Sequence, residues 1–185
     1  KSLGTLKYVA IATHGGEPAG FALGEMRVMD LPRLPQQTVA LAGICCIAPA
    51  HRRRGLFGHL EGRALGAAGI APQGRWLSTG RMAHPASFRV MRGAAGVVPK
   101  HGVVPTPWQQ TVGSAIANAY GSPGFDPVTF VVSGSGRPIG FPVIEMGEVL
   151  PEEWDVFRPV DRSRGDALLG LSWRTDAPEG WYDPE

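Results

Sequence analysis

The sequence has few cysteines, little excess charge and no long hydrophobic run, and each scarcity narrows the class of protein. Its 185 residues include two cysteines and carry a formal net charge of +2. A charge so close to zero argues against a nucleic-acid coat protein, whose surface would be basic overall. No apolar stretch is long enough to span a membrane, and no secretory hydrophobic segment opens the chain. We therefore expect a cytoplasmic protein with no membrane partner.

The two cysteines, Cys45 and Cys46, are adjacent within a predicted strand. Neighbouring side chains on a strand point to opposite faces, so a disulfide between them would be strained. We expect buried free thiols in a reducing compartment.

Composition and length predict one domain with many turns. Hydrophobic residues make up 43% of the chain and charged residues 18%, as in a soluble domain with one core. The 26 glycines and 17 prolines predict short elements. We expect a single domain over residues 1–185, with a core at about 6–135 and a C-terminal extension, 136–185, that completes the sheet. The first residue is Lys rather than Met, which is compatible with a trimmed chain or a piece of a longer protein.

Hydrophobic periodicity predicts the element order β-β-β-α-β-α-β-α-β, an α/β fold of the α+β type with a mixed sheet. A strand, a crossover helix and a further strand imply one parallel pair within it. Loops or turns are expected at Asp30–Gln37 and Ser133–Gly136, and a loosely held tail from Asp176. The predicted strands are Tyr8–Thr13, Ala19–Met29, Val39–Ile47, Arg75–Thr79, Gly96–Pro99 and Pro127–Ser133, and Ala167–Trp173 is a further, last strand candidate. The helices are about Leu56–Gly69, Pro85–Arg92 and Pro105–Tyr120.

One stretch organises the rest of the chain. Val39–Ile47 is nearly all apolar and stops at Pro49, as in a strand covered on both faces. Arg52–Arg54 and Gly55 follow, and the helical pattern starts near Leu56. A glycine-containing turn before a helix directs free N–H groups and the positive end of the helix dipole at one point. Arginines can add ion pairs to phosphate oxygens, so we favour a phosphate-binding turn over a merely solvated basic turn.

The spacing of this turn distinguishes among phosphate-binding motifs. It lacks the Gly-Lys-Ser/Thr of a P-loop and the three-glycine spacing of the dinucleotide fingerprint. It resembles motif A of the GNAT acyltransferases, Arg/Gln-x-x-Gly-x-Gly/Ala after a strand ending in hydrophobic-x-Pro. Ile47-Ala48-Pro49 supplies that strand end, Arg52 the leading residue and Gly55 the central glycine. Locally, residues 42–55 are most similar to the Eis-type aminoglycoside acetyltransferases, a likeness that does not extend to the C-terminal half.

The resemblance implies acetyl-CoA, or another short acyl-CoA, as co-substrate. Backbone amides of residues 53–58 would bind its pyrophosphate, and the backbone of residues 45–47 its pantetheine arm. Phe57 stands where the family usually has Gly or Ala. The element order implies a GNAT-like sheet that begins at the family's second strand, without the first strand and first two helices. The implied cofactor-binding residues are Cys45, Cys46, Ile47, Arg52, Arg53, Arg54, Gly55, Leu56, Phe57 and Gly58.

The implied reaction needs an acid for the leaving thiolate and a base for the incoming ammonium. The family's usual acid is a tyrosine in the helix after the fifth strand, but Pro85–Arg92 contains none. Tyr120 and His84 are the nearest replacements, and Glu25, on a predicted strand, is a candidate base. Each also has a structural interpretation: core packing for Tyr120, helix capping or packing for His84 and solvent exposure for Glu25.

We therefore expect an N-acyltransferase that transfers acetyl to a small-molecule or peptide amine by direct attack in a ternary complex. A degenerate, non-catalytic GNAT domain with a CoA-binding or partner-binding role is the alternative. A nucleic-acid-binding domain fits less well, because the net charge is low and no aromatic platform accompanies the arginines. The histidines have no ligand-like spacing, so we expect no metal site. The acceptor and the oligomeric state stay open, a homodimer included.

Overall fold

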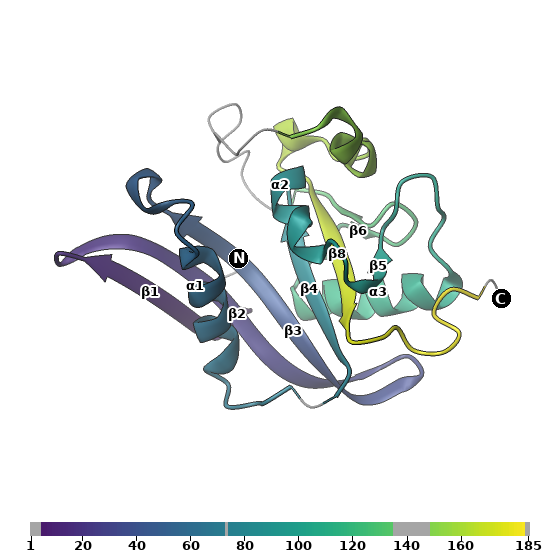
Figure 1. Ribbon diagram of the computed structural model, residues 1–185. Helices are drawn as coiled ribbons and strands as arrows, with labels where there is room; N and C mark the ends of the chain where they lie inside the picture. Colours follow the sequence, from purple (N-terminus) through teal and green to yellow (C-terminus); the bar gives the residue numbers. More distant parts are fainter. Residues whose placement is uncertain (1–4, 73, 135–148, 184–185) are drawn as a thin grey trace.

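One mixed sheet runs through the computed structural model, which describes residues 5–72, 74–134 and 149–183 (Figure 1). The strand order is β1-β2-β3-β4-β8-β7-β6, and β5 pairs with β8. Only β3 and β4 are parallel, and the other pairs are antiparallel, so the described chain has a mixed α+β architecture. The strands are β1 Tyr8–His14, β2 Glu17–Leu31, β3 Leu34–Ile47, β4 Trp76–Met82, β5 Ala95–Val98, β6 Phe125–Asp126, β7 Val131–Val132 and β8 Ala167–Arg174.

Helices cover both faces of this sheet. In Figure 1, α1 (Leu56–Gly66) and α2 (Pro85–Phe88) lie in front of it and α3 (Pro107–Ala119) lies behind. No helix among the described residues is long and apolar enough to cross a bilayer. The short 3₁₀ segments are η2 Pro49–His51, η3 Arg89–Met91, η4 Pro151–Phe157 and η5 Arg162–Arg164.

The larger core lies between the sheet and α3. Alternate strand residues such as Leu41, Leu77 and Trp173 point to this face and are fully buried. Helix α3 begins with a capping box, in which Thr106 and Gln109 each accept the other's backbone N–H. The opposite face, under α1, has a much smaller core centred on Ala22, Leu60 and Ala64. The helix–sheet layer with α3 is therefore the main source of hydrophobic stabilisation.

The predicted loop Asp30–Gln37 is wrong, because β2 and β3 continue into a tight hairpin. β2 ends at Leu31 and β3 begins at Leu34. The Asp30 carboxylate accepts hydrogen bonds from the Gln36 backbone N–H at 2.9 Å and from its side-chain amide at 3.1 Å. These bonds, with a left-handed φ of 52° at Gln36, accommodate the two prolines that suggested a loop.

The predicted strand Pro127–Ser133 is mostly a turn. Only Val131–Val132 is extended and paired. The Asp126 carboxylate accepts from the Val128 N–H at 2.9 Å and the Thr129 hydroxyl at 2.7 Å. This Asx-type turn outweighs the β propensity of the apolar residues that follow it.

The expectation of a loose tail from Asp176 is also wrong. Trp181 is 1% exposed, and its ring lies 5.3 Å from the rings of both Trp108 and Trp173. Gln109 Nε2 donates to the Trp181 carbonyl at 2.7 Å. Two aromatic contacts and a buried hydrogen bond therefore hold the tail against α3 and β8.

Smaller differences concern the element ends. The predicted helix Pro85–Arg92 is α2 followed by η3, and the helix expected at Pro105–Tyr120 begins two residues later. Of the predicted turn Ser133–Gly136, residues 135 and 136 lie outside the described residues.

Candidate functional site

The ladder between β3 and β4 stops early, and we use the word gap for the region where the two strands diverge. The two strands pair at four positions, from Val39–Leu77 to Ala42–Gly80. β3 then continues to Ile47, while the rest of β4 pairs only with β8. Figure 1 shows the two strands diverging beyond this point. We call residues 43–47 of β3 the free segment, because no β4 ladder uses the backbone groups on that edge.

A β-bulge accounts for the divergence. The β2–β3 register shifts so that Gly43 and Ile44 together oppose Leu23. A Cβ on Gly43 would lie 2.6 Å from Leu6 Cδ1 and 2.9 Å from the Leu23 carbonyl O, so the bulge requires glycine. Bulges bend the strand that carries them and increase its twist. The bend directs the free segment away from β4.

The free segment leaves the core, which corrects two expectations. Val39–Leu41 is buried, but Ile44 is 42% exposed, so Val39–Ile47 is not covered on both faces over its whole length. Cys46 is exposed and Cys45 half-buried, so the expected pair of buried thiols is wrong. Both cysteines are free. Burial, together with the nearby charges of Glu61 and Cys46, raises the pKa of the Cys45 thiol to about 11.

The turn before α1 presents backbone N–H groups at the mouth of the gap. Arg53 and Gly55 adopt left-handed φ values of 61° and 75°. Gly55 is the N-cap of α1 and supplies no side-chain cap. The N–H groups of the first turn, at Leu56, Phe57 and Gly58, have no intrahelical acceptor. The Phe57 side chain is 38% exposed and does not enter the core. An uncapped helix start of this kind can bind an anion.

The three arginines make the mouth electropositive. Arg52 Nε donates to the Ile47 carbonyl at 3.1 Å, which holds its guanidinium over the end of the free segment. Arg53 and Arg54 are exposed, and neither joins an ion pair with a described acidic residue. An unneutralised basic turn attracts anions to the same point as the helix dipole.

Tyr120 closes the apex of the gap from the α3 side. Its hydroxyl lies 2.8 Å from the Ala42 carbonyl O, 3.2 Å from the Thr79 carbonyl O and 2.9 Å from Thr79 Oγ1. The side chain is 2% exposed, and burial raises the pKa of Tyr120 well above its usual range. The Arg81 guanidinium lies 4.9 Å from the ring centroid. The hydroxyl thus occupies the point where the β3–β4 ladder would otherwise continue.

His84 lies on the opposite wall of the mouth, two residues after β4 ends. Its Nδ1 accepts the Ala86 N–H at 3.1 Å, which confirms the helix-capping interpretation. Its ring lies 5.2 Å from that of Trp154. Burial and the charges of Arg162 and Arg89 lower the pKa of His84, so the ring is neutral at neutral pH. Nε2 is the ring nitrogen that the cap does not use.

Glu25 is not brought to the gap, because β3 lies between β2 and the gap. It is 4% exposed, so the solvent-exposed alternative is wrong. Its carboxylate pairs with Arg27 at 2.7 Å and Lys7 at 3.6 Å. Burial alone would raise the pKa of Glu25, but Arg27 and Lys7 lower it overall. The structure thus gives this carboxylate a structural ion pair on β2.

The residue that sequence reasoning missed is Glu61. It is half-buried on α1, although it lies off the apolar stripe of that helix. Burial raises the pKa of Glu61, and Arg174 on β8 opposes that shift. A charge on β8, more than a hundred residues away in the sequence, leaves no signal in the local pattern. Within the described residues, no group of three or more His, Cys, Asp or Glu side chains could hold a metal ion.

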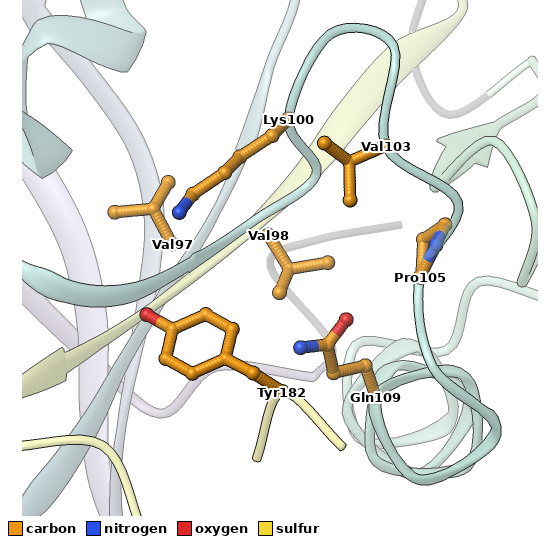
Figure 2. Close-up of a pocket in the computed structure, with 7 residues that line it drawn as sticks. All are labelled: Val97, Val98, Lys100, Val103, Pro105, Gln109 and Tyr182. Carbon is orange, nitrogen blue, oxygen red and sulfur yellow. The ribbon is translucent and has the colours of Figure 1, made fainter. Parts of the chain in front are cut away.

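A separate pocket of about 120 Å³ lies between β5, the loop before α3 and the tail (Figure 2). The polar groups of Lys100 and Gln109, which line this pocket, already interact with other residues. Lys100 Nζ lies 5.2 Å from the Tyr182 ring, and the Gln109 amide is used by Thr106 and Trp181. We therefore assign it to packing rather than to function. Its lining residues are Val97, Val98, Lys100, Val103, Pro105, Gln109 and Tyr182.

Comparison of the chain with known protein families and with curated proteins finds no match.

Proposed function

We propose that this chain is an acyl-CoA-dependent N-acyltransferase of the GNAT type that transfers acetyl to an amine by direct attack. One observation carries the proposal. The uncapped, basic N-terminus of α1 follows the end of β3, whose edge toward β4 is not paired with that strand beyond Ala42. An elongated ligand with a phosphate end and an amide-bearing arm matches both parts, as acyl-CoA does. The sequence resemblance of the turn to motif A supports the same assignment.

The pyrophosphate would bind the N–H groups of residues 53–58, with Arg53 and Arg54 adding charge. The pantetheine arm would extend along the free segment and pair its amides with the strand backbone, as an added strand does. Five residues at about 3.3 Å each give that arm roughly 16 Å of edge. The thioester would then approach the apex of the gap, and a backbone N–H of the free segment would donate to its carbonyl oxygen.

Of the three predicted catalytic residues, Tyr120 lies nearest that apex. Its hydroxyl would have to release the Ala42 carbonyl before it could protonate a thiolate. His84 could act only through Nε2, because Nδ1 caps α2. The acid role of either residue stays a prediction. Glu25 is the weakest of the three, since its carboxylate is bound by Arg27 on the far side of β3.

The described fold is compatible with a GNAT sheet that starts at the family's second strand. The β3-α1-β4 crossover is the unit in which motif A would lie. The layer behind the sheet is built by α3, which comes after β5 in the chain. We propose that α3 takes the place of helices that the resemblance implies before β1.

Calorimetry with acetyl-CoA and the variant Gly55→Asp tests the site. Wild type should bind, and the variant should bind at least about tenfold more weakly, because the new carboxylate meets the pyrophosphate at the helix start. Gly55→Asn adds similar bulk at the same left-handed position without the charge. Gly62→Asp adds the same charge later in α1, where a Cβ meets nothing within 4 Å. Binding by Gly55→Asp equal to that of both controls would contradict the assigned site.

A non-catalytic domain that binds a CoA thioester is the second candidate. It is favoured by the absence of a tyrosine in α2, where Phe88 packs against Phe157, and by the burial of the Tyr120 hydroxyl. Thiol release from acetyl-CoA, followed over a panel of amines, distinguishes the candidates. Steady turnover with any amine excludes the inert domain.

A further inference from the structure

One margin of the sheet ends in an edge strand with nothing paired to its outer side. β1 is the first strand of the order, and Figure 1 shows it at the outer margin of the sheet. Within the part of the chain that the structure describes, its only ladder is the one with β2. The backbone N–H and C=O groups on its outer side therefore have no strand partner. Such an edge is a template for a further strand.

β1 lacks the features that normally prevent edge pairing. Its seven residues, YVAIATH, include no proline, lysine, arginine or carboxylate. The β1–β2 register shift places its extra residue, Ala19, in β2, so β1 itself is not bulged. At the other end of the strand order, β6 has two residues, one of which is Asp126. Because short strands and charges protect an edge, the described sheet is protected at β6 and open at β1.

β1 also presents apolar side chains to water. Ala10 and Ala12 are partly buried against the small core under α1. Val9 and Ile11 alternate with them along the strand and point to the opposite face, where they are 49% and 68% exposed. A strand added to β1 would give both side chains a cross-strand neighbour as well as completing the backbone hydrogen bonds.

The charges that flank β1 favour a second copy of this chain as the added strand. Lys7 directly precedes β1, and its side chain is 73% exposed although it lies 3.6 Å from Glu25. Glu17 follows the turn after β1, is exposed and joins no ion pair with a described residue. Antiparallel pairing of two β1 strands brings each Lys7 to the end where the other copy has Glu17, whereas parallel pairing places like charges together. We propose that β1 pairs antiparallel with β1 of a second copy, which joins the two sheets across a twofold axis.

Full overlap of the two strands centres the pair on Ile11. Ile11 then lies opposite the same residue of the other copy, and Val9 lies opposite Thr13. Seven residues give a contact roughly 24 Å long. Interfaces below about 1,200 Å² are typical of weak association, so a dissociation constant of about 1–100 µM is expected. β2 separates this edge from β3, so the inference is independent of the proposed acyl-CoA site.

Sedimentation equilibrium of the chain, from about 1 to 300 µM, measures the association. Ile11→Lys places two lysines opposite each other at the centre of the pair and should weaken it at least about tenfold. The matched control is Val28→Lys, at a 48% exposed valine of β2 beyond the β1 ladder, which ends at Gly24. It should dimerise as wild type does, and urea unfolding checks that both variants keep the fold. A wild type that stays monomeric over the whole range, or equal dimerisation of Ile11→Lys, would overturn the proposal.

A charge exchange tests the direction of pairing without altering β1. The basic turn also lies toward the Glu17 end of β1, since the rings of His14 and His51 are 5.2 Å apart, so Lys7 and Glu17 are tested directly. Glu17→Lys and Lys7→Glu each place like charges at both ends of the pair and should weaken it about threefold. A mixture of the two variants restores opposite charges and should form a heterodimer with near wild-type affinity. Failure of the mixture to recover would contradict the antiparallel arrangement.

Amide hydrogen exchange distinguishes edge pairing from packing of two sheet faces. In an antiparallel pair, alternate residues of β1 direct their N–H groups at the new strand. Exchange at these alternate amides should therefore slow as the protein concentration rises through the dissociation constant. A dimer whose β1 amides all exchange at the rate of the monomer would show that the copies associate elsewhere, and would overturn the pairing of β1.

Discussion

The two ends of β3 differ in strand pairing and in burial. At one end, Val39 and Leu41 are fully buried, and the backbone pairs with β2 on one edge and β4 on the other. Past the bulge at Gly43, the strand pairs with β2 alone, and Ile44 is 42% exposed. One strand thus pairs on both edges at one end and on a single edge at the other. The difference teaches that ending a ladder early leaves a strand edge to which a ligand could bind, without a separate loop.

The largest expected effect is a difference in the free energy of unfolding between substitutions at the two ends of β3. Leu41→Ala removes a fully buried side chain between β3 and α3 and should lower the free energy of unfolding by about 3 kcal/mol. Ile44→Ala, three residues later, should cost less than about 1 kcal/mol, because the side chain already contacts water. Urea unfolding measures both. Equal losses would mean that the free segment is as firmly packed as the rest of β3.

Tyr120→Phe tests the hydroxyl at the boundary between the two ends. It leaves the Ala42 carbonyl at the apex without its 2.8 Å partner, so we expect a loss of about 1–2 kcal/mol in urea unfolding. Tyr182→Phe is the matched control. Its hydroxyl accepts the Gly96 N–H at 2.8 Å, but the residue is 53% exposed, so water can replace the bond. A loss of stability no greater than that of the control would mean that the hydrogen bond from Tyr120 to the Ala42 carbonyl does not stabilise the fold.

An acid-sensitive ion pair joins η3, which follows α2, to η4. The hydrogen bond from Arg89, helped by the Leu150 N–H and by Arg92, lowers the pKa of Glu153 from 4.5 to about 2. Because the folded-state pKa is depressed, the stabilisation is present above pH 4.5 and is lost as the pH falls toward 2. We expect the melting temperature of wild type to fall over this window more steeply than that of Glu153→Gln. Parallel curves would mean that the pair contributes nothing there.

The smallest expected effect concerns the arginines at the mouth. Arg54→Ala should weaken acetyl-CoA binding about threefold at low salt, and the difference should shrink as salt screens the exposed charge. Arg63→Ala removes an equally exposed charge from the last turn of α1. Calorimetry at two salt concentrations compares them. Equal losses in both variants would indicate a general charge effect rather than a local anion site.

Local patterns predicted the parts of the fold that short-range chemistry determines. The apolar run before Pro49, the basic turn and the start of α1 at Leu56 were predicted from residues adjacent in the chain. His84 and Pro85 predicted the start of α2 because capping depends on neighbouring residues. The proposed anion site depends on the same short-range chemistry, since its parts lie within about seven consecutive residues, and it stays a prediction.

The features that sequence reasoning missed depend on distant partners. The bulge at Gly43 is set by Leu6 and Leu23, and the tail by Trp108 and Trp173. The β3–β4 ladder ends early because the bulge at Gly43 bends β3, while β4 stays paired with β8 on its other edge. Such contacts join residues many positions apart and leave no periodic trace in the chain.

The most direct test of the central claim is an NMR titration of the chain with acetyl-CoA, followed through its backbone amides. The account predicts that the amides of the free segment, residues 43–47, and of the turn, residues 53–58, shift together and saturate at one ligand concentration. Amides of Leu77 and Trp173, in the packed part of the sheet, should stay in place. Shifts confined to the Lys100–Tyr182 pocket, or no shifts at saturating ligand, would contradict an acyl-CoA site in the gap.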